Sequence, residues 1–395
     1  MSGGDGNLAD PFLREGERAG SISLGPLLLA FLKIGSIGFG GSMAVIALME
    51  REFVHKRRLI NVDEFVHGVG LGQILGPFAV NTSIFLGYRL YGVLGGLLCA
   101  IAFLAPSITL VIGLSYLYFQ YHAIPALQAV VLGLGPVVIA LIASAAWSIG
   151  RKVVRSPKAG AIAVAAAAAG LAKTNAVWVL LAAGVAGWFL SRQEGNAAHL
   201  SSEKTSGGSP LAGVAPIALA PFGHLASVFV TFLKVGFVFF GGGFVLIPIL
   251  HHRLVTELRW LSTREFLDGV AISNLTPGPI AVLATFAGYR VAGIGGALAA
   301  TIALFAPAAV LMLAITRQYT RFRDDRRVMR FLSGVNPAVT GLIASAAVLL
   351  GQNALASWRG FLLAGLSLIL LVRFRWHPAF VLAIGAAAGF FKVLP

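Results

Sequence analysis

Two lysines stand out because each lies deep inside an apolar stretch and is followed within a few residues by a glycine cluster. A charged side chain at the centre of a membrane costs about 2.5–3.5 kcal/mol on insertion scales, so a lysine kept there suggests a chemical role. Glycines in such a run loosen the helix and let a ligand approach the backbone. The residues are Lys33, Gly40, Gly41 and Ser42 in one stretch and Lys234, Gly241 and Gly242 in the other. A compact ammonium beside open backbone groups is suited to binding an anion.

A second interruption follows each stretch, at the tip of a predicted re-entrant hairpin. The tips read Leu75-Gly76-Pro77 and Pro277-Gly278-Pro279. Proline favours the first turn of a helix, so we expect a helix to begin at each tip, with its free N–H groups and positive dipole end toward the membrane centre. Such a helix end binds anions. Polar residues near the tips are further candidate ligands: Gln73, Asn81, Asn274 and Thr276.

The acidic residues are expected elsewhere, in tails, loops and helix ends, with none in the middle of a span. A cation pathway would need carboxylates or carbonyl cages, so this inventory favours an oxyanion. We interpret His67 and Asp268, which occupy equivalent helix-start positions, as caps or surface groups. Without a buried acid, we expect the membrane potential, and not a proton relay, to drive transport.

Structural interpretations of the same residues stay open. Lys33 and Lys234 can extend to the membrane surface along their apolar stems. The glycine clusters can be surfaces on which helices pack closely, and the tips can be plain turns between short helices. Arg89 and Arg290, each after a Gly-Tyr pair, are expected to be interfacial anchors.

The composition places the chain in a lipid bilayer and argues against an enzyme. Of 395 residues, 57% are hydrophobic and 11% are charged, against about 25% charged in a typical soluble domain. The net charge of +15 does not indicate nucleic acid, because much of it lies in short loops between apolar runs. The motifs of phosphate-binding loops, zinc proteases and serine hydrolases are missing, so we expect no ATP-driven step in cis, no catalysis and no cofactor or metal.

The second part of the sequence repeats the first at a spacing of 201 residues, the difference between positions 33 and 234. The same spacing joins Glu64 to Glu265, Arg89 to Arg290, Pro106 to Pro307 and Pro136 to Pro337, with one local slip at the hairpin tips. Such self-similarity indicates two homologous halves. We predict a polar tail at 1–22, a first repeat at 23–190, a polar linker at 191–221 and a second repeat at 222–395.

The basic loops indicate that the halves face opposite ways. The segment 151–158 is basic in the first half, whereas in the second half the basic segment is 317–330; their repeat equivalents carry few basic residues. Because basic loops stay in the cytoplasm, the swap predicts inverted repeats. Arg253, Arg259 and Arg264 would then lie outside, which argues against it. We predict an all-α polytopic membrane protein of two inverted homologous repeats, each with about five spans plus a re-entrant hairpin, an architecture typical of secondary transporters.

As a set, the motifs resemble those of the chromate ion transporter family, over both halves of the chain. They are Phe39-Gly40-Gly41, Phe240-Gly241-Gly242, Pro277-Gly278-Pro279, Gly87-Tyr88-Arg89 and Gly288-Tyr289-Arg290. The first half departs from this pattern, because its tip lacks the leading proline and Ser42 stands where proline often follows Phe-Gly-Gly. Both departures lie in the predicted site and leave the exact substrate open.

The resemblance implies a multi-pass protein of the inner membrane that exports chromate and confers resistance to it, with sulfate as the related oxyanion. Two other kinds of transport stay open: uptake or exchange of sulfate-like anions, and a passive anion channel. An intramembrane enzyme is a more distant alternative. A homodimer is also left open.

Overall fold

The computed structural model describes most of the chain, and each regular element in the described part is a helix. The described residues are 22–38, 42–121, 124–172, 174–192, 223–239, 243–317, 326–355 and 357–391. The predicted tail and linker lie almost entirely outside these residues, so their boundaries stay predictions. The chain is an all-α membrane protein built from two repeats.

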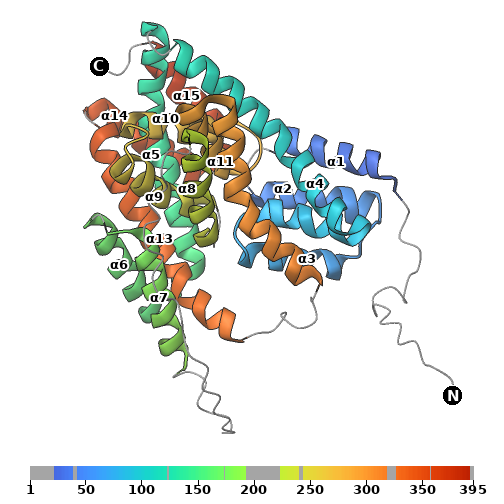
Figure 1. Cartoon of the computed structure of the whole chain (residues 1–395). Helices are drawn as coiled ribbons and strands as arrows, with labels where there is room; N and C mark the ends of the chain where they lie inside the picture. The colour runs from blue at the N-terminus through green and yellow to red at the C-terminus, as the bar shows by residue number, and fades with distance from the viewer. Residues whose placement is uncertain are drawn as a thin grey trace, which may run out of the picture.

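The two halves contain matching series of helices (Figure 1). The first comprises α1 (Leu24–Ile37), α2 (Ser42–Met49) with the π-helix η2 (Glu50–Lys56), α3 (Val62–Ile74), α4 (Phe78–Tyr121), α5 (Pro125–Val153), α6 (Pro157–Leu171) and α7 (Ala176–Arg192). The second comprises α8 (His224–Val238), the 3₁₀-helix η4 (Gly243–Val245), α9 (Leu246–Leu250), the π-helix η5 (His251–Glu257), α10 (Thr263–Leu275), the 3₁₀-helix η6 (Ile280–Val282), α11 (Leu283–Arg317), α13 (Arg326–Ala354), α14 (Trp358–Val372) and α15 (Pro378–Phe390).

Glycines in the left-handed region of backbone space make the hairpin tips and fold the long helices back. They are Gly76 (φ 112°) and Gly278 (φ 106°) at the tips, and Gly92 (φ 63°) and Gly293 (φ 58°) inside α4 and α11. Only glycine adopts this conformation without a steric cost. At Gly92 the chain folds so sharply that Gly87 lies directly against Gly95. The first part of α4 packs against α3 to form the first hairpin, and the start of α11 packs against α10 to form the second.

Equivalent helices of the two halves run antiparallel where they cross. Along α5 and α13 the facing pairs are Gly135 with Ala354, Ile139 with Gly351, and Gly150 with Thr340. Along α4 and α11 they are Gly96 with Leu313 and Tyr118 with Phe286. In both pairs the residue number rises along one helix as it falls along the other, which is the relation that inverted repeats require.

The halves also interlock through close packing of small residues. Helix α5 of the first half packs against α14 and α15 of the second, and α13 packs against α6 and α7 of the first (Figure 1). A side chain at Gly133 would collide with the backbone at Gly385, and one at Gly334 would collide with the backbone at Ala183. Small residues let helices approach in this way inside a membrane, where the hydrophobic effect does not drive association.

Four helical segments are long and apolar enough to cross a membrane, judged by length and composition: Phe78–Tyr121, Gln128–Val153, Ile280–Thr316 and Ser333–Gln352. Six shorter apolar helices of 10–17 residues accompany them, three in each half. Within the described residues each half therefore has five apolar helices in addition to the first arm of its hairpin, α3 or α10. Several are shorter than the ~20 residues of a full crossing.

Candidate functional site

The described structure brings the end of α1 in the first half to the hairpin tip of the second half. The Gly278 N–H donates a hydrogen bond to the Gly38 carbonyl oxygen over 3.1 Å. The Ser107 hydroxyl, from the long part of α4, donates to the carbonyl oxygen of Pro277. Gly38 directly precedes the first glycine cluster, so interrupted segments of opposite halves meet here, as an inverted-repeat transporter requires. We call the contact among Gly38, Ser107 and residues 277–279 the junction.

Within the described residues, the other hairpin tip has no counterpart of the Ser107 hydrogen bond. At the spacing of 201 residues Ser107 corresponds to Ala308, which has no hydroxyl to donate. In the second half, Gly243 at the start of η4 lies directly against the Ile280 side chain of its own hairpin. The two halves therefore share a fold but not the same chemistry at the centre.

Asn81 is an unsatisfied polar residue on α4, the helix that also carries Ser107. It lies in the first turn of α4, where its backbone N–H donates to the Pro77 carbonyl oxygen over 2.9 Å. Its side chain is 0% exposed, and neither amide atom has a hydrogen-bond partner in the described part of the chain. The neighbouring hydroxyls of Thr82 and Ser83 donate to carbonyl oxygens of their own helix. A buried amide without a partner costs about 1–3 kcal/mol, so its retention calls for a ligand or a water molecule.

Asn81 and the junction belong to the same part of the fold. Because α4 folds back at Gly92, Ile84 lies against Gly96. The N-terminal turn with Asn81 therefore runs back along the segment that carries Ser107. We take the first hairpin tip, the junction and Asn81 together as the candidate site, because α4 carries both Asn81 and Ser107.

The two lysines lie on exposed faces of α1 and α8. One turn to either side of Lys33, the apolar side chains of Leu29 and Ile37 are also exposed. The exposed side chain of Phe237 lies one turn after Lys234 along α8. Neither ammonium has a hydrogen bond or ion pair within the described residues, and neither lines the cavities described below. Their role in binding an anion stays a prediction.

Of the other predicted site residues, the structure describes the side chains of Asn274 and Thr276. Asn274 donates its amide to the Val270 carbonyl oxygen over 2.8 Å, and the buried Thr276 hydroxyl donates to the Ser273 carbonyl oxygen over 3.0 Å. Each therefore uses one donor to close the end of α10. Outside the described residues lie Gly40, Gly41, Gly241 and Gly242, as do the side chains of Ser42 and Gln73.

One sequence interpretation is wrong. Asp268, expected to be a cap or surface group, is 2% exposed, and its carboxylate accepts a hydrogen bond from the Tyr118 hydroxyl over 2.6 Å. Arg89 and Arg290 form ion pairs with Glu64 and Glu265, which join the two arms of each hairpin, and their role as interfacial anchors stays a prediction. The signal for these ion pairs was present in the repeat, because the acid–arginine pair recurs at one spacing.

The ion pair of the second hairpin lies at the wall of a cavity of about 330 Å³ lined by Tyr118, Phe119, Glu265, Tyr289 and Arg290. Burial alone would raise the pKa of Glu265, at the start of α10, but hydrogen bonds from Ser262 and Arg290 outweigh it and lower the pKa. Glu265 is therefore ionised beside the Arg290 guanidinium, which also lies over the Phe119 ring at 5.5 Å.

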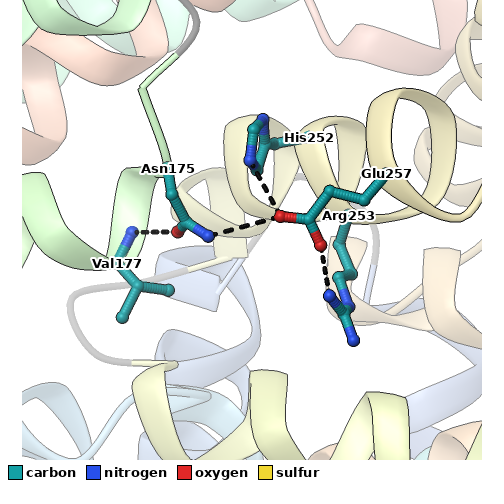
Figure 2. A network of polar contacts seen from close by, with 5 residues as sticks. All are labelled: Asn175, Val177, His252, Arg253 and Glu257. Carbon is teal, nitrogen blue, oxygen red and sulfur yellow. Dashed lines mark hydrogen bonds and ion pairs between the residues drawn. The ribbon is translucent and has the colours of Figure 1, made fainter. Parts of the chain in front are cut away.

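A second cavity of about 220 Å³ lies among α6, α9, η5 and α13, with hydroxyl, imidazole and amide groups in its wall. Beside it, Figure 2 shows the Glu257 carboxylate accepting hydrogen bonds or forming ion pairs with three residues. These are His252 at 3.0 Å, Arg253, and the Asn175 amide at 3.4 Å. Asn175 also accepts from the Val177 N–H at the start of α7. This network fastens the α6–α7 connection of the first half to η5 of the second.

Comparison with known proteins agrees with the two-repeat fold. The family model described as chromate transporter matches twice, over residues 25–188 and 226–390. A chromate transport protein of Cupriavidus metallidurans is 30% identical over 379 residues, covering 93% of this chain and 94% of its own length. A chromate transport protein of Pseudomonas aeruginosa is 33% identical, covering 84% of this chain and 82% of its own length.

A shorter relative matches one half alone. An uncharacterized transporter of Bacillus subtilis is 29% identical over 159 residues, which are 39% of this chain and 89% of its own length. No solved structure matches the chain significantly. With both halves matched by the family model, and relatives at 30% identity or more along most of its length, the chain belongs to the chromate transporter family.

Proposed function

We propose that this protein is a secondary transporter that exports chromate across the inner membrane and thereby confers resistance, with sulfate and other tetrahedral dianions as competitors. Two relatives along most of the chain are named chromate transport proteins. The observation that carries the proposal is the candidate site: a fully buried amide without a partner, next to a helix N-terminus and a contact between interrupted segments of opposite halves. Open N–H donors at a helix N-terminus suit an oxyanion.

Further members of the site are proposed from the sequence. We place Lys33 and Lys234 near the permeating dianion as countercharges, and the glycine clusters, Gln73, Ser42, Asn274 and Thr276 as backbone or side-chain contacts in one or more states of the cycle. Asn274 would donate its second amide N–H, because one described bond uses the first, and the Thr276 hydroxyl would change partner from the Ser273 carbonyl oxygen to the oxyanion.

The test is oxyanion flux in two settings. Cells with and without the gene are loaded with chromate while external sulfate is varied, and the purified protein is reconstituted in proteoliposomes. Export predicts lower chromate accumulation in cells that carry the gene, and saturable flux that sulfate inhibits. Higher accumulation would instead indicate uptake, and flux that does not saturate would indicate a channel. Either result would overturn the proposal.

The inverted topology has a separate test. The segments 151–158 and 317–330, together with the linker, should all face the cytoplasm, because their basic residues follow the positive-inside pattern. Single cysteines placed there in a Cys99→Ala background report their side by labelling with a membrane-impermeant reagent. Alanine should be tolerated, since the buried Cys99 corresponds to the buried Ala300 of the second half. Labelling of any of the three from the periplasm would contradict the inversion.

A further inference from the structure

Asp268 is a buried carboxyl group with little to stabilise its charge. It lies on α10 between the buried side chains of Leu267 and Val270 and is 2% exposed. No ion pair to it is found within the described residues, and its described hydrogen bond comes from the Tyr118 hydroxyl. Burying a carboxylate costs several kcal/mol unless donors surround it, whereas the neutral acid avoids most of that cost. With one described donor, the ionised form of Asp268 depends on the hydrogen bond from Tyr118.

The hydrogen bond to Asp268 crosses from one half of the protein to the other. Tyr118 belongs to α4 of the first half and Asp268 to α10 of the second. The aromatic rings at the end of α4 pack against α11: the Tyr118 ring lies tilted against Phe286 with 5.7 Å between the ring centroids, and Phe119 stacks on Tyr289 at 6.2 Å. A displacement of one half against the other would lengthen or break the bond. The proton affinity of Asp268 is therefore linked to the relative position of the halves.

A route for the proton is also present. Tyr118 contributes both the hydroxyl that contacts Asp268 and part of the wall of the 330 Å³ cavity. The charged groups nearby are Arg264 and Glu265 on α10 and Arg290 on α11, where Glu265 and Arg290 neutralise one another. On η5, the His251 ring lies against Phe266 at 5.3 Å, near the start of α10. The Tyr118 side chain thus connects the Asp268 carboxyl group to a cavity that has charged residues in its wall.

We propose that Asp268 and Tyr118 form a proton-binding site whose occupancy changes with the transport conformation. In the arrangement described, the Tyr118 hydroxyl donates to the Asp268 carboxylate. When the halves separate at this contact, the carboxylate loses its donor and takes up a proton from the cavity, becoming the neutral acid; the return movement releases it. The coupling to transport rests on the proposed function, but the proton site itself does not.

The proton site is tested on the purified full-length protein by infrared spectroscopy, through the C=O stretch of protonated carboxylic acids as pH is raised. The wild type should show a band that is missing in Asp268→Asn and retained in Asp63→Asn. The latter is the matched control, because Asp63 is an exposed acid on the corresponding hairpin arm α3. In Tyr118→Phe the band should persist to higher pH, because the charged form has lost its donor. Identical titrations of wild type and Asp268→Asn, or a shift to lower pH in Tyr118→Phe, would overturn the proposal.

The coupling is tested in proteoliposomes with the membrane potential held at zero and a pH gradient imposed, using chromate and sulfate as probes. Flux by the wild type and Asp63→Asn should respond to the gradient, and Asp268→Asn should lose that response. An unchanged response in Asp268→Asn would refute the coupling. If the wild type moves neither oxyanion under any gradient, the proposed function fails, while the infrared titration still decides whether the proton site exists.

Discussion

Replacing Asn81 by leucine should make the protein more stable and less able to bind an oxyanion. The two side chains are similar in size, so the change removes the buried amide without leaving a large hole. Because the amide has no described partner, its removal should raise the free energy of unfolding by about 1–3 kcal/mol. Most core substitutions destabilise, so a gain in stability would itself be diagnostic.

The magnitude of the binding loss follows from the same amide. A hydrogen bond to a charged group contributes about 1.5–3 kcal/mol. At about 1.4 kcal/mol per factor of ten, Asn81→Leu should weaken chromate binding roughly 10- to 100-fold. In the wild type, chromate at about 100 times its Kd should add about 2.7 kcal/mol of stability. In the variant this gain should fall to about 0.4–1.4 kcal/mol at the same chromate concentration.

The assay is thermal unfolding of the purified protein with and without chromate or sulfate, followed by flux in proteoliposomes. Ser83→Ala is the matched control: Ser83 is buried two residues away, its hydroxyl donates to the Ala79 carbonyl oxygen over 2.9 Å, and its equivalent in the second half is Ala284. This control should keep its response to chromate. A stabilised Asn81→Leu with wild-type chromate binding and flux would mean that the amide holds only a water molecule, and the reasoning would be refuted.

Three further outcomes are expected. Lys33→Met and Lys234→Met should each lower flux much more than expression, because size is kept while the countercharge is lost; wild-type flux in both would assign the lysines to the membrane surface. Gly278→Ala should lower the thermal unfolding temperature, because φ is 106° there and a Cβ would collide with Ser107, whereas Gly70→Ala, with open space around the Cβ, should not; equal unfolding temperatures would contradict the strain. Chromate flux should follow an imposed potassium diffusion potential, because a dianion gains about 4.6 kcal/mol per 100 mV; flux indifferent to the potential would show that charge movement is compensated.

The interpretation of Asp268 shows how a correct sequence observation led to a wrong conclusion. Asp268 does stand early in its helix, five residues after Thr263 at its start, which is why it was interpreted as a cap or surface group. Capping is instead performed by Ser262 and Glu265, whose side chains and backbone N–H groups bond reciprocally. Three residues beyond Glu265, Asp268 lies where α10 is already covered by α4. The expectation that potential alone drives transport assumed no buried acid, and that assumption fails at Asp268.

The membrane class, the two repeats and the positions of the helix breaks can be predicted from the amino-acid sequence alone. Apolar length, the 201-residue spacing and the residues Gly76-Pro77 and Gly278-Pro279 are local properties, so they can be read without knowing what lies beside them. The antiparallel relation of the halves was also predictable, because basic loops record the side of the membrane on which they stay.

Which residues of one half meet those of the other depends on the three-dimensional fold. Ser107 and Pro277 are 170 residues apart, and Tyr118 and Asp268 are 150 apart, so no local pattern connects them. The same holds for Asn81, which appeared in the sequence as one polar residue among several near a helix start. Its burial without a partner, and the use of Asn274 and Thr276 to close their own helix, depend on the packing of α3, α4 and the opposite half around them. Hydrogen bonds and burial act over a few ångströms in space, whereas sequence patterns record only neighbours along the chain.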